Sequence, residues 1–306
     1  LTDLGPAEWL DRLDEVGEEH GYLERLGRAH AALFVDAGRD LLVTFETGEA
    51  ARKLPRALPR GLDLVPRTGW SLLSIVAEGE TWFRARELYG FFDRLTDDGF
   101  FEDFDRVIFY GAGMCGYAAA AFSVAAPGAT VVAVQPQATL DPRMTEWDPR
   151  FTEMRRTSFT DRFGYAPDML DAAHRAFILY DPRQELDAMH AALFARSNVT
   201  RLRMPHMGGA LQTRLIEMEM LYRILSLAAD GKLSEQEFYK LYRARRQNTS
   251  YLRSLMGRLD ADDRPFLNTL LCRNVTGRMN APRFRRRLDD LENQAEEGKL
   301  AESSSR

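Results

Sequence analysis

The stretch DRVIFYGAGMCGYAAAAF (residues 105–122) carries the most information about the fold of this 306-residue chain. It begins with an apolar run, RVIFYG (106–111), passes through closely spaced glycines and continues into a run rich in alanine. Glycine tolerates the backbone angles and close approaches of a sharp turn, and alanine has the highest helix propensity. The stretch therefore predicts a buried strand, a tight turn and a helix in direct succession.

Similar strand-like runs recur along the chain and alternate with helical patterns. They are short, apolar and bounded by Gly, Pro or Asp, as expected of strands in a parallel sheet, and they cover residues 30–37, 40–46, 71–78, 106–111, 130–136, 176–182 and 200–205. The helical patterns cover residues 80–96, 114–126, 165–174 and 184–196. The alternation predicts an α/β fold with a mostly parallel sheet flanked by helices. The turn residues Gly38-Arg39-Asp40 add one predicted antiparallel hairpin between the first two runs.

One interpretation of the glycine turn is a dinucleotide-binding loop. The spacing Gly111-x-Gly113-x-x-Gly116 matches the pattern in which glycines let a pyrophosphate approach a helix N-terminus. That interpretation expects an acidic residue at the end of the next strand to hold a ribose hydroxyl, and this chain has Gln135 there. The turn also follows at least three predicted strands instead of opening the fold.

A second interpretation uses the neighbouring residues as well. The segment YGAGMCGYAA (110–119) resembles the nucleophile elbow of the α/β-hydrolase superfamily, in the variant G-x-S-M-G-G-Y-A-A. The resemblance implies an α/β-hydrolase-like fold over about residues 30–212. It assigns Gly113 to the position of the catalytic serine and Cys115 to the position of a glycine. The residues that carry the elbow are Gly111, Gly113, Met114 and Gly116.

The same resemblance implies where an acid and a histidine belong. The run AFILYDP (176–182) ends a predicted strand with Asp181, at the superfamily's acid position, and Asp187 is the alternative acid. The run TRLRMPHMGGAL (200–211) carries His206 in a loop after the last predicted strand. The order of nucleophile position, acid and histidine is that of the superfamily.

Three hypotheses for function follow. Because Gly113 has no side chain, the first is a non-hydrolytic relative that binds a small-molecule ligand or a protein partner. The second is a hydrolase or acyltransferase for esters or thioesters. It would use Cys115, whose thiol pKa a helix N-terminus would lower, or an Asp181–His206 pair as acid and base. The third is a dinucleotide-binding protein that uses Gly111, Gly113 and Gly116.

The sequence predicts no metal and no cofactor. Its other histidines, His20, His30, His174 and His190, do not have metal-ligand spacing, and no Gly-Lys-Ser/Thr phosphate loop occurs. His190 is predicted on the solvent face of a helix.

The net charge of −5 is an average over unlike segments. Residues 1–231 sum to −10, residues 232–287 to +9 and the last nineteen residues to −4. The strand signal ends near residue 212, so we predict a helical lead (1–29), a sheet domain (30–212) and a basic helical extension (213–306) whose acidic tail is disordered. Three interpretations of the basic face remain open: a face that is solvated or docked on the acidic body, a surface for a protein partner or, less favoured, a surface for nucleic acid. The residues concerned are Arg243, Arg245, Arg246, Arg285, Arg286 and Arg287.

Composition excludes several classes of protein. At 45% hydrophobic and 28% charged residues, the chain can bury a core and is not a disordered protein. It contains no run of about 18 apolar residues, so no membrane-spanning helix is expected. Its two cysteines, Cys115 and Cys272, cannot form a disulfide framework, which predicts a cytoplasmic protein.

Overall fold

The computed structural model describes residues 4–304, and the side chains of residues 4–297. Contacts divide the chain into two compact units, Leu1–Tyr242 and Arg243–Arg306. The first unit contains the sheet. The sequence placed the domain boundary after residue 212, but helices α10 (Met220–Ala229) and α11 (Glu235–Leu241) contact the sheet and belong to the first unit.

The first unit is built on an eight-stranded sheet with the order β1-β2-β4-β3-β5-β6-β7-β8. The β1–β2 and β2–β4 pairs are antiparallel, and the other pairs are parallel. The mostly parallel sheet flanked by helices that the sequence predicted is confirmed. The strands are β1 (Gly21–Leu26), β2 (His30–Val35), β3 (Asp40–Thr47), β4 (Ser71–Ala77), β5 (Arg106–Ala112), β6 (Thr130–Val134), β7 (Arg175–Tyr180) and β8 (Val199–Arg203).

The antiparallel edge differs from the prediction in two ways. Residues 21–26, assigned to the helical lead, form β1, which pairs with β2 through a turn at Gly27 (φ +68°). The predicted hairpin at Gly38-Arg39-Asp40 is wrong, because β4 lies between β2 and β3 in the sheet. A local turn signal cannot reveal a strand that inserts from further along the chain.

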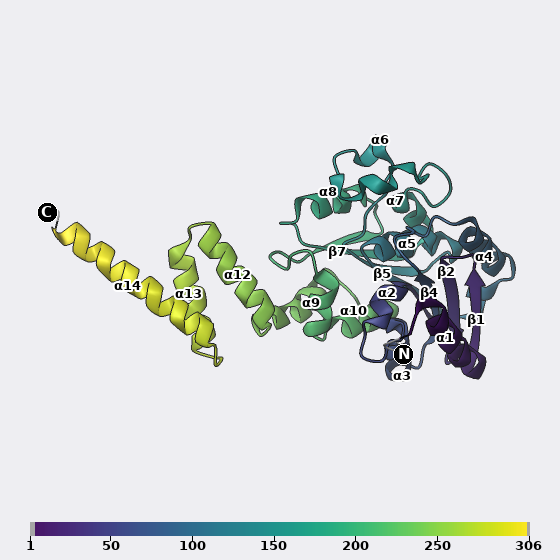
Figure 1. Ribbon diagram of the computed structural model, residues 1–306, viewed down its shortest axis with the longest axis horizontal. Coiled ribbons are helices and arrows are strands. Elements are labelled where there is room, and N and C mark those ends of the chain that lie inside the picture. Colours follow the sequence, from purple (N-terminus) through teal and green to yellow (C-terminus); the bar gives the residue numbers. More distant parts are fainter. Residues whose placement is uncertain (1–3, 305–306) are drawn as a thin grey trace. The chain divides into compact units, whose positions relative to one another are not determined.

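Helices cover both faces of the sheet (Figure 1). Helices α4 and α5 pack on the face formed by Val43, Phe45, Ile75 and Phe109, whereas Gly61 of α3 contacts Leu72 on the other face. Alternate strand residues thus point into two separate cores. The helices of this unit are α1 (Pro6–His20), α2 (Gly48–Arg52), α3 (Arg60–Thr68), α4 (Arg86–Asp97), α5 (Met114–Phe122), α6 (Pro142–Thr145), α7 (Ala166–Met169), α8 (Glu185–Leu193), α9 (Leu211–Glu217), α10 and α11. Short 3-10 helices are η1 (Phe100–Asp103), η2 (Ser123–Ala125), η3 (Pro149–Arg156), η4 (Leu170–Ala172) and η5 (Tyr242–Arg246).

The strand order reverses between β3 and β5. From β3 the chain runs to β4 on one side, then crosses to β5 on the other side of β3. In open α/β sheets, ligands bind beyond the carboxyl ends of the strands at such a switch point. Thr47 ends β3 and Ala112 ends β5, so the residues that follow them define the expected site.

Within the part of the second unit that the structure describes, three α-helices follow η5, most of which also belongs to this unit. They are α12 (Thr249–Ala261), α13 (Pro265–Thr276) and α14 (Pro282–Ser304). Phe284, Leu288 and Leu291 of α14 are buried, as are Cys272 and Val275 of α13. The tail that was expected to be disordered continues as α14 to residue 304, and residues 305–306 lie outside the described residues.

Two further predictions concern membrane-spanning helices and disulfide bonds. Over the described residues, none of the helices combines the length and the apolar character required to cross a bilayer. Both cysteines, Cys115 and Cys272, are buried and unpaired with each other.

Candidate functional site

The turn between β5 and α5 has the backbone of a sharp strand-to-helix bend. Gly113 stands at its apex with φ +59° and ψ −126°, a conformation that only glycine adopts without strain. A Cβ at Gly113 would meet no atom within 4 Å. The apex therefore has room for a side chain, and the sequence supplies none.

At Gly111 and Gly116, close backbone contacts and not the backbone angles require glycine. A Cβ on Gly111 would lie 2.0 Å from the carbonyl oxygen of Cys115, and one on Gly116 would lie 3.2 Å from the carbonyl oxygens of Gly111 and Val134. These glycines let the first turn of α5 pass directly over β5 and β6. The Gly113 N–H also donates to the Val134 carbonyl (2.8 Å). The spacing of Gly111 and Gly116 is thus used for packing within the protein.

A cavity of about 480 Å³ opens beside Gly113, at the switch point of the sheet; we call it the Gly113 cavity. Its wall combines aromatic and apolar side chains with a few charged and amide groups. The lining residues are Phe45, Glu46, Thr47, Glu49, Ala50, Leu54, Arg60, Gly79, Glu80, Trp82, Ala112, Gly113, Met114, Cys115, Gln137, Phe151 and Gln212. A neighbouring cavity of about 330 Å³ shares Ala112, Gly113, Gln137 and Gln212 with it.

Cys115 lines the Gly113 cavity but is not activated. Burial raises the pKa of its thiol, and the charge of Glu46 raises it further. The sequence predicted the opposite shift, from the helix N-terminus. Because the thiolate is the nucleophilic form of cysteine, the structure disfavours Cys115 as a nucleophile.

Asp181 and His206 come together through the backbone. The fully buried Asp181 carboxylate accepts the N–H groups of His206 (3.2 Å) and Gly208 (2.7 Å), and that of Arg183 (2.9 Å). His206 itself has a positive φ of 66°. Among the described residues that line the two cavities beside Gly113, neither Asp181 nor His206 is present. Asp181 therefore stabilises the conformation of the loop after β8. We call the Asp181 side chain and the loop residues 206–208 the Asp181 corner; Asp181 and His206 line neither cavity.

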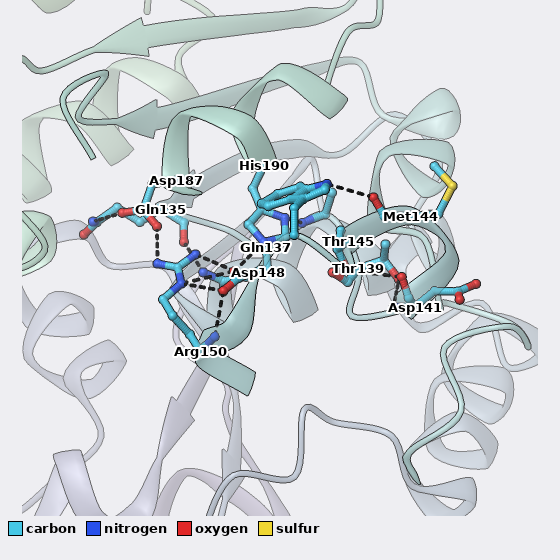
Figure 2. A network of polar contacts seen from close by, with 12 residues as sticks. Gln135, Gln137, Thr139, Asp141, Met144, Thr145, Asp148, Arg150, Asp187 and His190 are labelled. Carbon is cyan, nitrogen blue, oxygen red and sulfur yellow. Dashed lines mark hydrogen bonds and ion pairs between the residues drawn. The ribbon is translucent and has the colours of Figure 1, made fainter. Parts of the chain in front are cut away.

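Asp187, the alternative acid, belongs to a buried polar network (Figure 2). Arg150 bridges Asp187 (2.6 Å) and Asp148 (2.8 Å), and Gln135 donates to Asp187 (2.8 Å). Gln135 also accepts the N–H of Leu211 (2.9 Å). The side chain that the dinucleotide interpretation placed at a ribose is thus engaged within the protein.

His190 is part of the same network, and its predicted exposure is wrong. It is fully buried, with Nδ1 accepting the N–H of Ala138 (3.2 Å) and Nε2 2.9 Å from the Asp148 carboxylate. Nδ1 acts as an acceptor, so in the neutral ring Nε2 carries the hydrogen and donates it to Asp148. Burial lowers the pKa of His190 and outweighs the opposing effect of Asp148.

Asp148 remains ionised in this network. Burial opposes its charge, but the Arg150 side chain and backbone, with His190, outweigh burial and lower the pKa of Asp148. The network ties the segment after β6 to α8 and forms part of the wall of the smaller cavity.

Sequence reasoning missed two charged residues at the switch point, Glu46 and Arg60, which both line the Gly113 cavity. Glu46 near the end of β3 accepts the N–H groups of Arg60 (2.6 Å) and Gly61 (3.0 Å), and so caps α3. Burial raises the pKa of Glu46, although these N–H groups and the Thr44 hydroxyl lower it in part. The signal available in the sequence was an acid at the carboxyl end of a buried strand, but only the strand order shows that this strand flanks the crossing.

Several of the predicted interaction arginines are exposed, among them Arg243, Arg246, Arg285 and Arg286. Arg287 instead pairs with Asp260 (2.6 Å) inside the second unit. No group of three potential metal ligands occurs among the described residues.

No protein-family model and no curated protein matches this chain. Among solved structures, it is similar to an esterase of Pyrobaculum calidifontis, with 14% identity over 76% of this chain and 94% of that one, at a TM-score of 0.42. A thermostable esterase from Pseudomonas putida gives 16% identity, coverage of 74% and 89%, and a TM-score of 0.41. A capsule O-acetyltransferase of Neisseria meningitidis serogroup A gives 12% identity, coverage of 66% and 94%, and a TM-score of 0.40. Likeness this distant says nothing of what this chain does.

Proposed function

We propose that this chain is a non-hydrolytic α/β-hydrolase-like protein that binds a small molecule in the Gly113 cavity. The observation that carries the proposal is a cavity of about 480 Å³ at the switch point, directly beside an apex that has no side chain. Its volume and its mixture of aromatic and polar lining are those of small-molecule sites. Without a nucleophile at the apex, bound ligand is held and not cleaved by the usual covalent route.

Two buried polar atoms support a ligand in this place. Within the described part of the chain, four buried side-chain polar atoms lack a hydrogen-bond partner, and Trp82 Nε1 and Gln137 Oε1 are two of them. Both residues line the Gly113 cavity and are at most 4% exposed. An unpaired buried donor or acceptor costs about 1–3 kcal/mol. A small shift on ligand binding that paired these atoms would recover that free energy.

The alternative, a hydrolase or acyltransferase with altered chemistry, has weaker support. Burial raises the pKa of Cys115, and Asp181 is occupied by backbone N–H groups. Hydrolysis of p-nitrophenyl acetate and butyrate distinguishes the two functions. We expect no turnover above the buffer rate, whereas turnover abolished by Cys115→Ala or His206→Ala would establish the hydrolase.

Binding itself is tested with a cavity-blocking variant. Ala50 is exposed on α2 and lines the cavity, so Ala50→Trp fills the opening without disturbing the core. Met189→Trp, on the exposed side of α8, is a matched control outside the cavities. In a fragment screen by thermal shift, stabilising fragments should act on the native chain and on Met189→Trp but not on Ala50→Trp. Fragments that stabilise all three proteins equally would contradict the proposal.

A second candidate function is protein interaction through the second unit. The observation that favours it is a cluster of exposed apolar residues on α13: Phe266 (72% exposed), Leu267 (49%) and Leu270 (46%). Exposed arginines of the same unit, such as Arg285 and Arg286, suit an acidic partner. A photo-crosslinking residue in place of Phe266 should capture one acidic protein that the same residue in place of the exposed Met144 does not; equal capture at both sites would discount this function.

A further inference from the structure

We propose that the ligand of the Gly113 cavity is an organic monocarboxylate with an apolar body, and that Arg60 binds its carboxylate. This inference rests on the proposed function and adds the chemical class of the ligand. The argument uses the charges of the cavity, the free donors around it and the character of its wall.

Arg60 supplies the positive charge of the cavity wall, and it lies near enough to Glu46 to lower the pKa of that carboxyl. Within the described residues it is the only Lys or Arg that lines the cavity, and its guanidinium forms no hydrogen bond or ion pair with another described side chain. The residue is half-buried at the start of α3. A guanidinium in a partly buried site is suited to bidentate recognition of a carboxylate.

The three acids of the wall leave this charge available. Glu49 pairs with Lys53. Glu46 accepts the N–H groups of Arg60 and Gly61 at the start of α3, so its carboxyl is engaged by the backbone. Burial raises its pKa, against the lowering effects of these N–H groups, the Thr44 hydroxyl and the Arg60 charge. Glu80 is exposed, where water and salt screen its charge.

Further donors belong to residues that line the cavity. Met114 and Cys115, in the first turn of the nine-residue helix α5, both line the cavity. First-turn N–H groups have no acceptor within their helix and carry partial positive charge. The unpartnered Nε1–H of Trp82, a residue 1% exposed that lines the cavity, is an independent sign of a missing acceptor, and the unpartnered Oε1 of Gln137 in the same wall calls for a donor on another part of the ligand.

Five apolar side chains make up much of the remaining wall. Phe45, Leu54, Trp82, Met114 and Phe151 line it. Trp82 and Phe151 meet edge to face, with ring centroids 4.8 Å apart. These side chains suit an aromatic or branched aliphatic body attached to the carboxylate, because burial of apolar surface supplies affinity while Arg60 supplies orientation.

Matched probes test the charge of the ligand. We would titrate 3-phenylpropionate, 3-cyclohexylpropionate and 4-methylpentanoate into the full chain by calorimetry, each beside its uncharged amide and the corresponding primary amine. At least one acid should bind about tenfold or more tightly than its amide, the worth of a charge-assisted hydrogen bond. Arg60→Gln should abolish that difference while leaving the amide affinity unchanged, because the Arg60 backbone N–H that binds Glu46 is retained. Arg286→Gln, at an exposed arginine that lines neither cavity, is the matched control and should not weaken binding of the acid.

The outcomes separate this inference from the proposed function. If the amides or amines bind as tightly as the acids, and Ala50→Trp blocks them, the carboxylate inference is overturned and ligand binding in the cavity stands. An acid preference that survives in Arg60→Gln overturns the role of Arg60. If no acid binds more tightly than its amide and Ala50→Trp has no effect on any probe or fragment, both proposals are overturned.

Discussion

The turn at Gly113 and the corner at Asp181 and His206 preserve different parts of the pattern that the sequence suggested. At the turn the backbone keeps the strained bend of φ +59° and ψ −126°, but the apex has no side chain. At the corner the carboxylate and the histidine are both present, but Asp181 accepts backbone N–H groups and neither residue lines the cavities beside Gly113. Packing is enough to maintain the bend at Gly113, and buried hydrogen bonds are enough to maintain the loop at His206. Catalysis would also require reactive side chains from both places to meet at one cavity.

The largest effect should come from the packing glycine of the turn. Gly111→Ala places a Cβ 2.0 Å from the Cys115 carbonyl oxygen, and a backbone collision in the core cannot be relieved by a rotamer change. We expect a loss of more than about 3 kcal/mol in the free energy of unfolding, measured by urea denaturation. Gly209→Ala, whose Cβ meets nothing within 4 Å, is the control and should change stability by less than about 0.5 kcal/mol. Equal stabilities for the two variants would refute the packing role of Gly111.

The corner should respond to the loss of the acid more than to the loss of the imidazole. Asp181→Asn weakens the bonds from His206 and Gly208 and places an amide N–H₂ among buried donors, which should cost about 2–3 kcal/mol. His206→Ala retains the backbone N–H that Asp181 accepts, so its cost should be smaller. Denaturation of the two variants measures this order, and the reverse order would show that the imidazole, not the backbone, sustains the corner.

Restoring a hydroxyl at the apex should change stability without creating an enzyme. Gly113→Ser meets no steric clash but forces a side chain into a glycine conformation, at a cost of about 1–3 kcal/mol. We expect no hydrolysis of p-nitrophenyl acetate, because neither Asp181 nor His206 lines the cavity. Appearance of ester hydrolysis that His206→Ala removes would mean that the corner does reach the apex.

Acidification should destabilise the protein through its buried histidines. Burial lowers the pKa of His190, and it lowers that of His30 to about 4. Below the ordinary value of 6.5 the unfolded chain therefore binds protons that the folded chain does not, and stability falls as the pH drops from 6.5 towards 4. Each histidine should contribute a slope of up to about 1.4 kcal/mol per pH unit in this window. Urea denaturation at pH 7, 6 and 5 checks this, and replacing either residue with Gln should reduce the slope; an unchanged slope in both variants would contradict the burial of these rings.

The smallest effect is expected at the surface of the second unit. Arg285 and Arg286 are exposed on α14, so replacing both with Gln should change the free energy of unfolding by less than about 0.5 kcal/mol. Thermal and urea denaturation measure this. A large loss would show that these arginines have a structural role that excludes them as interaction residues.

Short sequence patterns predicted the individual strands and helices, whose formation depends mainly on neighbouring residues. The apolar runs predicted seven of the eight strands, β2 to β8, and the glycine turn predicted the helix at 114–122. The strand β1 was missed because GYLERL carries Glu24 and Arg25 on a sheet edge, where charged residues are tolerated.

The site was harder to predict because it depends on contacts between distant segments. His190 looked exposed on a helix pattern, but its partners Ala138 and Asp148 come from the segment after β6. Glu46 and Arg60 have no motif of their own. They can be assigned to a site only once the strand order is known, because the chain crosses from β4 to β5 on opposite sides of β3. No short sequence pattern encodes that order.

The central claim is that the Gly113 cavity binds a small molecule that the protein does not cleave. Titration of the isotope-labelled chain with the matched carboxylates, followed by NMR, tests it most directly. The account predicts saturable shifts of the Gly113, Met114 and Thr47 amide signals, no such shifts in Ala50→Trp, and recovery of the ligand unchanged. Shifts confined to other parts of the chain, or conversion of p-nitrophenyl esters by the same sample, would contradict it.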